Sequence, residues 1–394
     1  MSKFTLRFAA VGLAALFCTA PALAADPPPP PGGAAILSWT LDQQKYGYRN
    51  MEKLNPAHVV KRGDHVRALP VARTAIDPTW TWQGQPQTLA GYMAQMRTSG
   101  VLVLHDGEII LERYGLDRGP QDRWTSFSVA KSVTATLVGA AVKDGYIKSL
   151  DDPVTAYIPQ LKGSAYEGVS VRHLITMTSG VKWNEDYTDP NSDVAKVGFS
   201  TDEAGVNPVV SYMRKLPRES APGAKFVYKT GETDLVGILV SNAVGKPLST
   251  YLSEKIWAPF GMEQDAIWMD DIAGHERGGC CMSMTLRDYA RLGQFTLEGG
   301  KAGGVQVVPD GWMADATAEH VKFPAGSGVE TGYGYFWWLI PHGYAAEGIF
   351  GQEVIIYPKE KLVIAINSAW PVASDPKLWA AQAAFAEAVR AAVR

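Results

Sequence analysis

The stretch SVAKSVTATLVGAAVKDG, residues 128–145, is the part of the sequence that decides the fold. From Val129 to Val142 it is apolar or small on nearly every side, and Asp144-Gly145 is a stop signal for a helix. A helix that is apolar all round lies buried between the layers of a fold. The stretch therefore predicts a central, buried helix that starts at about Ser128.

The first turn of this helix carries a serine and a lysine three positions apart. Residues i and i+3 share a helix face, so Ser128 Oγ and Lys131 Nζ can meet. Burial favours the neutral amine of Lys131, which can accept the serine proton, and a helix N-terminus favours developing negative charge. The same spacing recurs at Ser179 and Ser374, but only Ser128 opens a long apolar helix. We therefore expect Ser128 to be a nucleophile.

Strand patterns lie on both sides of this helix. Val101–Leu104 and Glu108–Tyr114 flank Asp106-Gly107, which is typical of a β-hairpin. Near the other end of the chain, the sequence predicts strands at Tyr333–Ile340, Ile349–Tyr357 and Leu362–Asn367, and a helix at Lys377–Val393 that begins after Asp375-Pro376.

Residues from about 150 to 310 are mostly helical in pattern, as at Leu235–Ala243 and Leu286–Leu297. The sequence therefore predicts an α/β (α+β) fold. We expect an antiparallel sheet built from both ends of the chain, flanked by helices, with the mostly helical region inserted between its two halves.

Residues 1–25 have the order of a secretory signal peptide. Lys3 and Arg7 precede the apolar run Phe8–Phe17, and Ala22-Leu23-Ala24 supplies a small-residue cleavage site. The run is shorter than the roughly 20 apolar residues that span a bilayer. We therefore expect cleavage after Ala24 or Ala25, export to the periplasm or the medium, and no stable membrane anchor.

Composition limits the classes of protein that the mature chain can form. Of 394 residues 46% are hydrophobic and 20% charged, which is ample for a packed core and excludes a disordered or collagen-like chain. With 37 Lys+Arg against 40 Asp+Glu, there is no electrostatic footprint for nucleic acid. We expect a Pro-rich linker and an irregular N-terminal extension at residues 26–95, followed by one larger domain at 96–394 that contains the helical insertion.

Two cysteines, Cys280 and Cys281, remain in the mature chain and are neighbours. Adjacent Cα atoms lie about 3.8 Å apart, which is below the usual disulfide range. We therefore expect two buried free thiols beside the Gly278-Gly279 turn. The seven His lack the spacing of zinc ligands, and we expect no metal and no cofactor.

Several motifs in order carry a family resemblance. SFSVAKS at 126–132, VRHLITMTSG at 171–180 and the segment 279–300, with TLRDYAR at 285–291, resemble the serine β-lactamase and DD-peptidase superfamily, class C branch. NEDYTDP at 184–190 is closer to the 6-aminohexanoate-dimer hydrolases and related carboxylesterases. The resemblance covers about residues 90–390. It implies a β-lactamase/transpeptidase-like fold and an acyl-enzyme formed on Ser128.

The second motif of that superfamily, Tyr-x-Asn or Tyr-x-Ser, is similar to FVYKT at 226–230. The resemblance makes Tyr228 the partner of Lys131. A phenol beside an ammonium ionises more readily, so we expect Tyr228 to take the proton of Ser128 and return it to the leaving group. Lys229-Thr230-Gly231 spells the third motif, but it precedes a helix whereas that motif belongs on a strand. Thr230 is expected to contact the substrate.

The third motif itself is expected just before IFGQ at 349–352, where the aligned tripeptide is Ala346-Glu347-Gly348. Gly348 lets the strand backbone approach a substrate closely, and the N–H groups of Ser128 and Ile349 are the expected oxyanion hole. Ala346 stands where the superfamily has Lys, His or Trp, so no fixed cation is expected there for the carboxylate of a β-lactam. Tyr187, from its place in the 184–190 loop, is expected to donate a hydrogen bond to the leaving group.

These features predict an exported serine hydrolase that cleaves ester or linear amide bonds in small molecules. A β-lactamase or DD-carboxypeptidase with the same nucleophile is the first alternative, and a non-catalytic binding protein of the same fold is an alternative of another class. An α/β-hydrolase is disfavoured because no Gly-x-Ser-x-Gly occurs. The sequence carries no signal for an oligomeric state.

Overall fold

The predicted Asp-Gly hairpin forms one side of the main sheet. In a computed structural model that describes Met1, residues 29–198 and residues 203–394, β4 (Thr98–His105) and β5 (Glu108–Tyr114) pair antiparallel. Asp106 and Gly107 in the turn have φ of 50° and 81°, the positive values that two-residue hairpin turns require. The hairpin prediction is confirmed. The expected signal peptide falls almost wholly outside the described residues.

The main sheet joins strands from the two ends of the chain, as the sequence predicts. Its order is β11-β12-β13-β14-β15-β16-β4-β5, and the neighbouring strands pair antiparallel. The C-terminal strands are β11 (Val321–Lys322), β12 (Gly332–Tyr333), β13 (Trp338–Ile340), β14 (Gly343–Gly348), β15 (Gln352–Tyr357) and β16 (Leu362–Ser368). The pair β16–β4, next to the edge strand β5, therefore connects segments that are far apart in sequence.

Two of the predicted strand boundaries are wrong. Residues 333–340 do not form one strand, because the N–H groups of Tyr335 and Phe336 bond to Ala316 O and Ile175 O instead of a neighbouring strand. The chain turns there, with Phe336 at φ 57°. Residues 349–351 are likewise a turn between β14 and β15, and β14 was not predicted as a separate strand.

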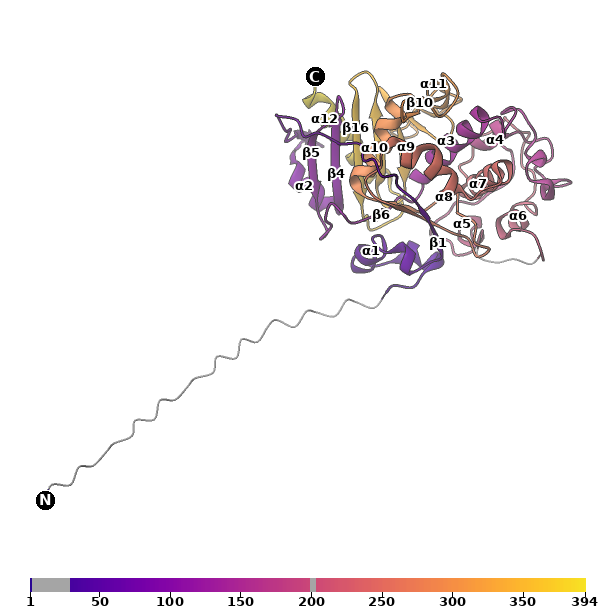
Figure 1. Ribbon diagram of the computed structural model, residues 1–394, viewed down its shortest axis with the longest axis horizontal. Helices are drawn as coiled ribbons and strands as arrows, with labels where there is room; N and C mark the ends of the chain where they lie inside the picture. Colours follow the sequence, from indigo (N-terminus) through magenta and orange to yellow (C-terminus); the bar gives the residue numbers. More distant parts are fainter. Residues whose placement is uncertain (2–28, 199–202) are drawn as a thin grey trace.

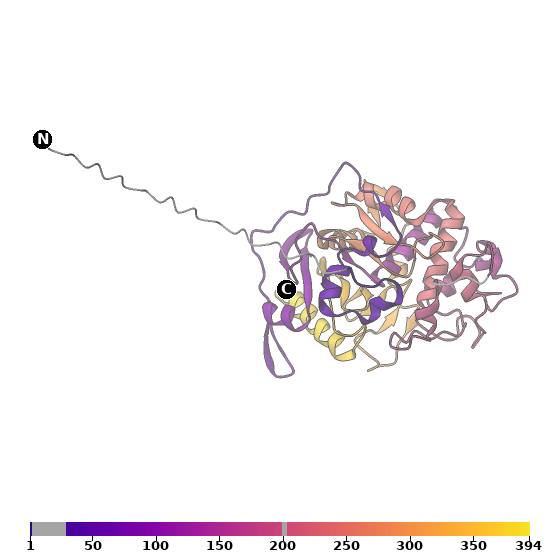
Figure 2. The same ribbon diagram turned by 90° about the horizontal axis from the view of Figure 1, so that it is seen from below.

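Helices cover both faces of this sheet. The helix predicted from the opening stretch is α3 (Val129–Lys143), which with α10 (Leu286–Leu297) packs on one face. The other face carries α2 (Leu89–Gln95) and α12 (Pro376–Ala392), and α12 is the yellow helix near the C-terminus (Figure 2). Because both faces are covered, β4 is buried along nearly its whole length.

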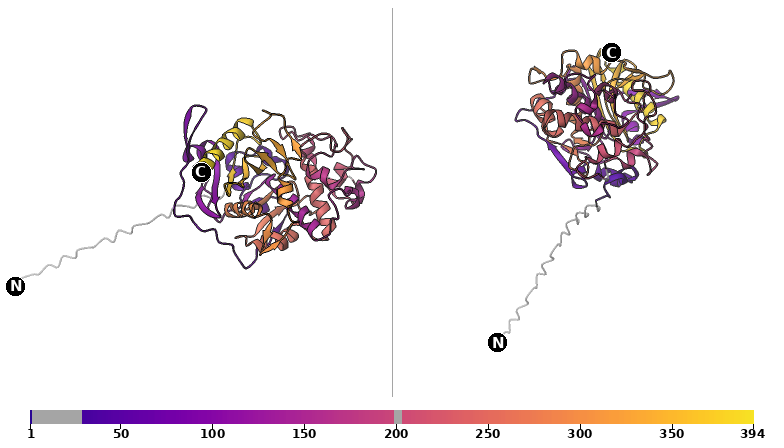
Figure 3. Two further views of the ribbon diagram at one scale, coloured as in Figure 1. Left: turned by 90° about the horizontal axis from the view of Figure 1, so that it is seen from above. Right: turned by 90° about the vertical axis from the view of Figure 1, so that its right-hand side faces the viewer.

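The helical region lies beside the sheet in Figure 1 and in the left view of Figure 3. It contains α4 (Val171–Ile175), α5 (Asp193–Lys196), α6 (Pro208–Met213), α7 (Thr230–Val244), α8 (Leu248–Leu252) and α9 (Ala258–Phe260), with the single-turn helices η3 (Val154–Ala156), η4 (Pro159–Leu161) and η5 (Ser253–Trp257). The remaining short elements after it are α11 (Trp312–Ala316), β9 (Lys301–Ala302) and β10 (Val305–Gln306). The mostly helical middle of the chain thus agrees with the sequence pattern, and α7 and α10 include the two helices predicted there.

The N-terminal extension is more regular than predicted. It contains η1 (Gly33–Ser38), α1 (Leu41–Gly47), η2 (Met51–Lys53), β1 (Ala57–Val60) and the hairpin β2–β3 (Thr79–Trp82, Gln85–Thr88). Thr40 and Gln43 form a capping box on α1. A second sheet, β1-β7-β8-β6, pairs β1 with β7 (Ala266–Met269), β7 with β8 (Met282–Met284) and β8 with β6 (Trp124–Thr125). The extension is therefore part of the folded core.

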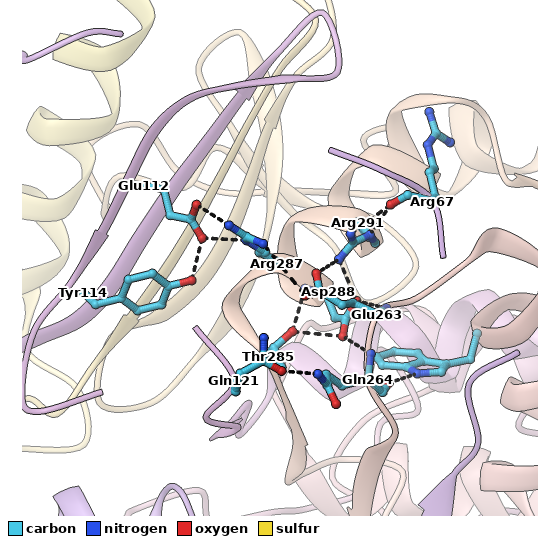
Figure 4. Close-up of polar contacts among 11 residues, drawn as sticks. Arg67, Glu112, Tyr114, Gln121, Glu263, Gln264, Thr285, Arg287, Asp288 and Arg291 are labelled. Atoms are coloured by element: carbon cyan, nitrogen blue, oxygen red, sulfur yellow. Dashed lines mark hydrogen bonds and ion pairs between the residues drawn. The ribbon is translucent and has the colours of Figure 1, made fainter. Parts of the chain in front are cut away.

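The charged residues of the 285–291 motif hold α10 in place (Figure 4). Arg287 bonds both carboxylate oxygens of Glu112 on β5, at 2.8 and 3.0 Å. Asp288 accepts from the backbone N–H groups of Glu263 and Gln264, at 2.7 and 3.0 Å, while Arg291 bonds Glu263 and Asp288. This part of the family resemblance therefore describes a structural network, since its side chains bond the neighbouring strand and loops.

Candidate active site

Ser128 lies where β6 ends and α3 begins. The backbone just before it is fixed to β8, since Ser126 N–H donates to Met282 O at 2.6 Å and Met282 N–H donates to Ser126 Oγ at 3.0 Å. Phe127 has φ 43°, a left-handed conformation that a bulky residue rarely adopts. The strained turn sets Ser128 at the head of the helix, where its side chain is only 8% exposed.

Lys131 is buried directly behind Ser128. Its Nζ lies 3.1 Å from Ser128 Oγ, 3.0 Å from Thr230 Oγ1 and 2.6 Å from the carbonyl oxygen of Gly279. The predicted contact across one helical turn is therefore present. Burial lowers the pKa of Lys131 from 10.5 to about 8, although the charge of Glu185 opposes the shift.

Thr230, the first residue of α7, connects Lys131 to a carboxylate. Its hydroxyl donates to Glu185, so towards Lys131 it can only accept. Glu185 also accepts from the Thr230 N–H at 3.0 Å, from the Tyr187 hydroxyl at 2.7 Å and from the indole N–H of Trp183. Thr230 is therefore a link in a hydrogen-bonded chain, and Glu185 is a site residue that the sequence analysis did not identify.

The acceptors around Lys131 determine what its neutral form can do. A neutral amine has two protons and one lone pair. The Gly279 carbonyl can only accept, and the Thr230 hydroxyl is committed to Glu185, so both protons are used. The lone pair is then left for the remaining neighbour, Ser128. The geometry thus suits removal of the serine proton by Lys131.

The position of Gly279 is set by the helices around it. Its N–H donates to Asp234 on α7 at 2.8 Å, and the carbonyl of Gly278 accepts from Thr134 on α3 at 2.7 Å. A Cβ on Gly279 would lie 2.8 Å from Thr230 O, so a side chain there would push the loop away from Lys131. The structure joins the next two residues, Cys280 and Cys281, in a disulfide, so the expectation of two free thiols is wrong. The spacing rule applied to them describes typical disulfides and did not account for a bridge between neighbours.

Tyr228 stands on the other side of Ser128, and its hydroxyl has a side-chain hydrogen bond with Ser128. Lys131 Nζ lies 5.0 Å from the centre of the phenol ring, and the ring stacks on Trp338 at 5.4 Å. The expectation of an easily ionised phenol is wrong. Burial and the charge of Glu185 raise the pKa of Tyr228 well above 10, because Lys131 faces the ring while carboxylates act on the hydroxyl. Tyr228 therefore remains a neutral phenol, a proton donor.

The end of β14 lies against the nucleophile turn. A Cβ on Gly348 would come 2.4 Å from Ser126 O and 3.0 Å from Ser128 N, so only glycine fits there. Within the described residues, no hydrogen bond is donated by the N–H of Ser128 or that of Ile349. The N–H groups of Ser128 and Ile349, the predicted oxyanion hole, thus lie next to the contact between Gly348 and the nucleophile turn, and their protons are free to bind a ligand. Ala346 is buried in the core behind them.

Two cavities meet at Ser128. One, of about 70 Å³, is apolar and is lined in part by Leu37, Trp39 and Met51 from the N-terminal extension. The other, of about 310 Å³, is lined by Tyr228 and by three carboxylates, Glu185, Glu330 and Glu347. Tyr187 and Ile349 border both cavities. Glu330 and Glu347 were not predicted as site residues, although Glu347 lies in the aligned tripeptide of the third motif.

The described residues contain no cluster of three or more His, Cys, Asp or Glu side chains that could hold a metal ion. Within the same residues, no helix is long and apolar enough to cross a membrane.

Comparison with known proteins identifies the group of enzymes to which this site belongs. The model of the family described as beta-lactamase matches residues 86–387, about three quarters of the chain. The chain belongs to the beta-lactamase family. Within it, the chain is 31% identical over 348 residues to the 6-aminohexanoate-dimer hydrolase of Paenarthrobacter ureafaciens, which spans 83% of this chain and 86% of that protein. It is 29% identical to Esterase EstB of Burkholderia gladioli, over 41% of this chain and 44% of the esterase.

A solved structure from Bacillus anthracis, of a protein assigned as a 6-aminohexanoate-dimer hydrolase, has the same fold. It superposes with a TM-score of 0.79 at 22% identity and covers 92% of this chain and 98% of its own. The family resemblance inferred from the motifs, and the β-lactamase/transpeptidase-like fold that it implies, are confirmed. The protein is a serine hydrolase of this family, similar to 6-aminohexanoate-dimer hydrolases and carboxylesterases.

Proposed function

We propose that the protein hydrolyses esters or linear amides through an acyl-enzyme on Ser128. The observation that carries this proposal is the set of contacts around Lys131, which leaves the lone pair of the neutral amine to Ser128. Lys131 takes the hydroxyl proton while Ser128 Oγ attacks the carbonyl carbon of the substrate. The carbonyl oxygen becomes an oxyanion, and the N–H groups of Ser128 and Ile349 bind it.

Tyr228 completes the first half of the reaction. The bond to the leaving nitrogen or oxygen breaks, and the neutral phenol of Tyr228 delivers a proton to that atom. Lys131, which took the serine proton, gives it up to restore the phenol of Tyr228. Water then attacks the acyl carbon and gives a proton to Lys131; the bond from that carbon to Ser128 Oγ breaks, Oγ takes the proton, and the acid is released. Tyr187 is half-buried at the border of both cavities and contacts the leaving group in this proposal. Thr230 and Gly348 contact the substrate.

The substrate class follows from what the site lacks. Ala346 places no cation where penicillin-directed enzymes of the superfamily bind a carboxylate, and the following residue, Glu347, is a carboxylate itself. A β-lactam or D-Ala-D-Ala carboxylate would meet like charge in this cavity. We therefore favour esters and linear amides over the β-lactamase or DD-carboxypeptidase alternative. A binding protein without activity would have no use for the lone-pair geometry at Lys131.

Export remains part of the proposal. The order of charge, apolar run and Ala-Leu-Ala in residues 1–25 supports a cleaved signal peptide and a periplasmic or secreted enzyme.

The proposal is tested by active-site labelling and a substrate panel. A fluorophosphonate probe should label the wild type and not the Ser128→Ala variant, and intact mass should show an acyl adduct only with Ser128 present. Labelling that survives in Ser128→Ala would move the nucleophile elsewhere. In steady state, nitrophenyl butyrate and a linear amide dimer should exceed nitrocefin in kcat/KM. If nitrocefin is best by tenfold or more, the β-lactamase alternative replaces this one.

A further inference from the structure

The larger cavity at Ser128 is strongly acidic. Three carboxylates line it, from Glu185, Glu330 and Glu347, and no Lys, Arg or His from the described part of the chain does so. Lys131 lies behind Ser128 and does not reach the cavity wall. A substrate group in this cavity therefore meets negative charge and no competing positive side chain.

Glu347 is the group in this cavity whose bonding is incomplete. It is only 7% exposed, yet no hydrogen bond or ion pair to it occurs among the described residues. Glu185, by contrast, is satisfied by four donors. A buried carboxylate without a partner is costly to the fold and is expected only where a ligand supplies the missing donor or charge.

The nearest residues would complete a site for a cation. Glu330, half-buried in the loop before β12, faces the same cavity, and its charge acts on Glu347. The rings of Trp338 and Trp379 form further parts of the wall. Carboxylates close to indole rings are surroundings in which ammonium groups bind, mainly through charge-assisted hydrogen bonds.

The position of Tyr228 decides which half of the substrate carries this cation. The acid that protonates the leaving atom must lie on the side where the leaving group departs. Tyr228 lines the acidic cavity and not the apolar one. The leaving group is thus directed to Glu347, and the acyl chain to the apolar cavity with Trp39 and Met51.

We propose that the preferred substrates have an apolar acyl group and a leaving group that ends in an ammonium, such as N-acyl diamines or aminoalkyl esters. Glu347 and Glu330 bind the ammonium. The inference rests on the proposed hydrolysis at Ser128 and narrows its substrate class. A leaving group that ends in a carboxylate is the least favoured, because it opposes ionisation of the same two residues and finds no cation on the cavity wall.

Three amides with one acyl group and leaving groups of matched length test this assignment. They are N-butyryl-1,4-diaminobutane (ammonium end), N-pentylbutyramide (methyl end) and N-butyryl-5-aminopentanoate (carboxylate end). Butyrate release, measured by mass spectrometry at pH 8, gives kcat/KM for each. We expect the ammonium amide to exceed the methyl one by about 10- to 150-fold, the range for one charge-assisted hydrogen bond, and the carboxylate amide to be slowest. Equal values for the ammonium and methyl amides would overturn the inference.

Variants test whether the two carboxylates cause the preference. In Glu347→Gln the ratio of kcat/KM for the ammonium amide to that for the methyl amide should fall at least fivefold. If Glu347→Gln does not fold, Glu330→Gln, which lies in a loop, gives the same readout. Glu108→Gln, an exposed carboxylate on β5, is the matched control and should keep the wild-type ratio. An unchanged ratio in both cavity variants would also overturn the inference.

Binding to Ser128→Ala separates this inference from the proposed function. Calorimetry with the uncleaved ammonium and methyl amides should show the same preference without any chemistry. If the wild type releases no butyrate but Ser128→Ala prefers the ammonium amide, the proposed function fails and the cation subsite stands. If the wild type hydrolyses all three equally, the hydrolase stands and the subsite fails.

Discussion

Replacing Glu347 by glutamine should stabilise the protein relative to the wild type. The difference in the free energy of unfolding should grow as the pH rises above 4.5. Burial and the neighbouring charges of Glu330 and Glu353 raise the pKa of Glu347 well above its ordinary 4.5. Glu347 in turn raises the pKa values of Tyr228 and Tyr333, and no cation in the described structure lines its cavity. The folded state thus favours the protonated acid, while the unfolded chain releases the proton near pH 4.5.

The sign and size of the effect follow from that difference. A carboxyl with a raised folded-state pKa contributes its full stability below the unfolded pKa and loses it as the pH rises from there. The loss is at most about 1.4 kcal/mol for each pH unit between 4.5 and the folded-state pKa, so its upper limit at pH 7 is roughly 3 kcal/mol. Glutamine does not titrate, so the variant avoids this loss.

Thermal unfolding at several pH values measures the effect. The melting temperatures of Glu347→Gln and wild type should be close at pH 4.5, and the variant should be higher by several degrees at pH 7, at roughly 1–3 °C for each kcal/mol in a chain of this length. Glu108→Gln should track the wild type throughout. A Glu347→Gln protein that melts at or below the wild-type temperature at pH 7, after matching it at pH 4.5, would refute the reasoning.

Two further predictions concern the reaction. Because Lys131 with a pKa of about 8 must be neutral to act as the base, kcat/KM for the neutral ester nitrophenyl butyrate should rise about tenfold per pH unit and level off above pH 8; a flat profile from pH 6 to 9 would exclude Lys131 as the titrating base. Tyr228→Phe should lower kcat on a linear amide by about 10²–10⁴-fold with little change in melting temperature, and should affect nitrophenyl butyrate much less, because nitrophenolate leaves without a proton. Equal losses on both substrates would assign the phenol another role.

Local patterns in the sequence predicted those elements whose hydrogen bonds are local. The β4–β5 hairpin and helices α3 and α10 follow from a turn dipeptide and from hydrophobic periodicity, and α10 has the predicted bounds. The bend at residues 334–337 could not be found in this way. It depends on bonds from Tyr335 and Phe336 to segments that lie far away in the sequence. The same holds for β1, whose partner β7 follows some 200 residues later.

Only part of the candidate site could be predicted, because the rest also depends on contacts between distant segments. Ser128 and Lys131 are one helical turn apart, so their contact is visible in the sequence. Glu185 reaches Lys131 only through Thr230, and Glu330 lies in a Gly-rich loop with no motif of its own. The preference of Tyr228 for its neutral form also escaped prediction, because it depends on carboxylates brought near by the fold.

The pairing of strands from the two ends of the chain also determines when, during synthesis, the active site can form. Ser99 Oγ donates to Asn367 O across the β4–β16 junction, 268 positions along the chain, so this pair closes a very long loop. Such non-local pairing is slow to form and cannot begin during synthesis until the last strand has emerged. Ser128 and Ile349, whose N–H groups are the proposed oxyanion hole, both lie within this loop. A growing chain therefore cannot assemble its active site until synthesis is almost complete.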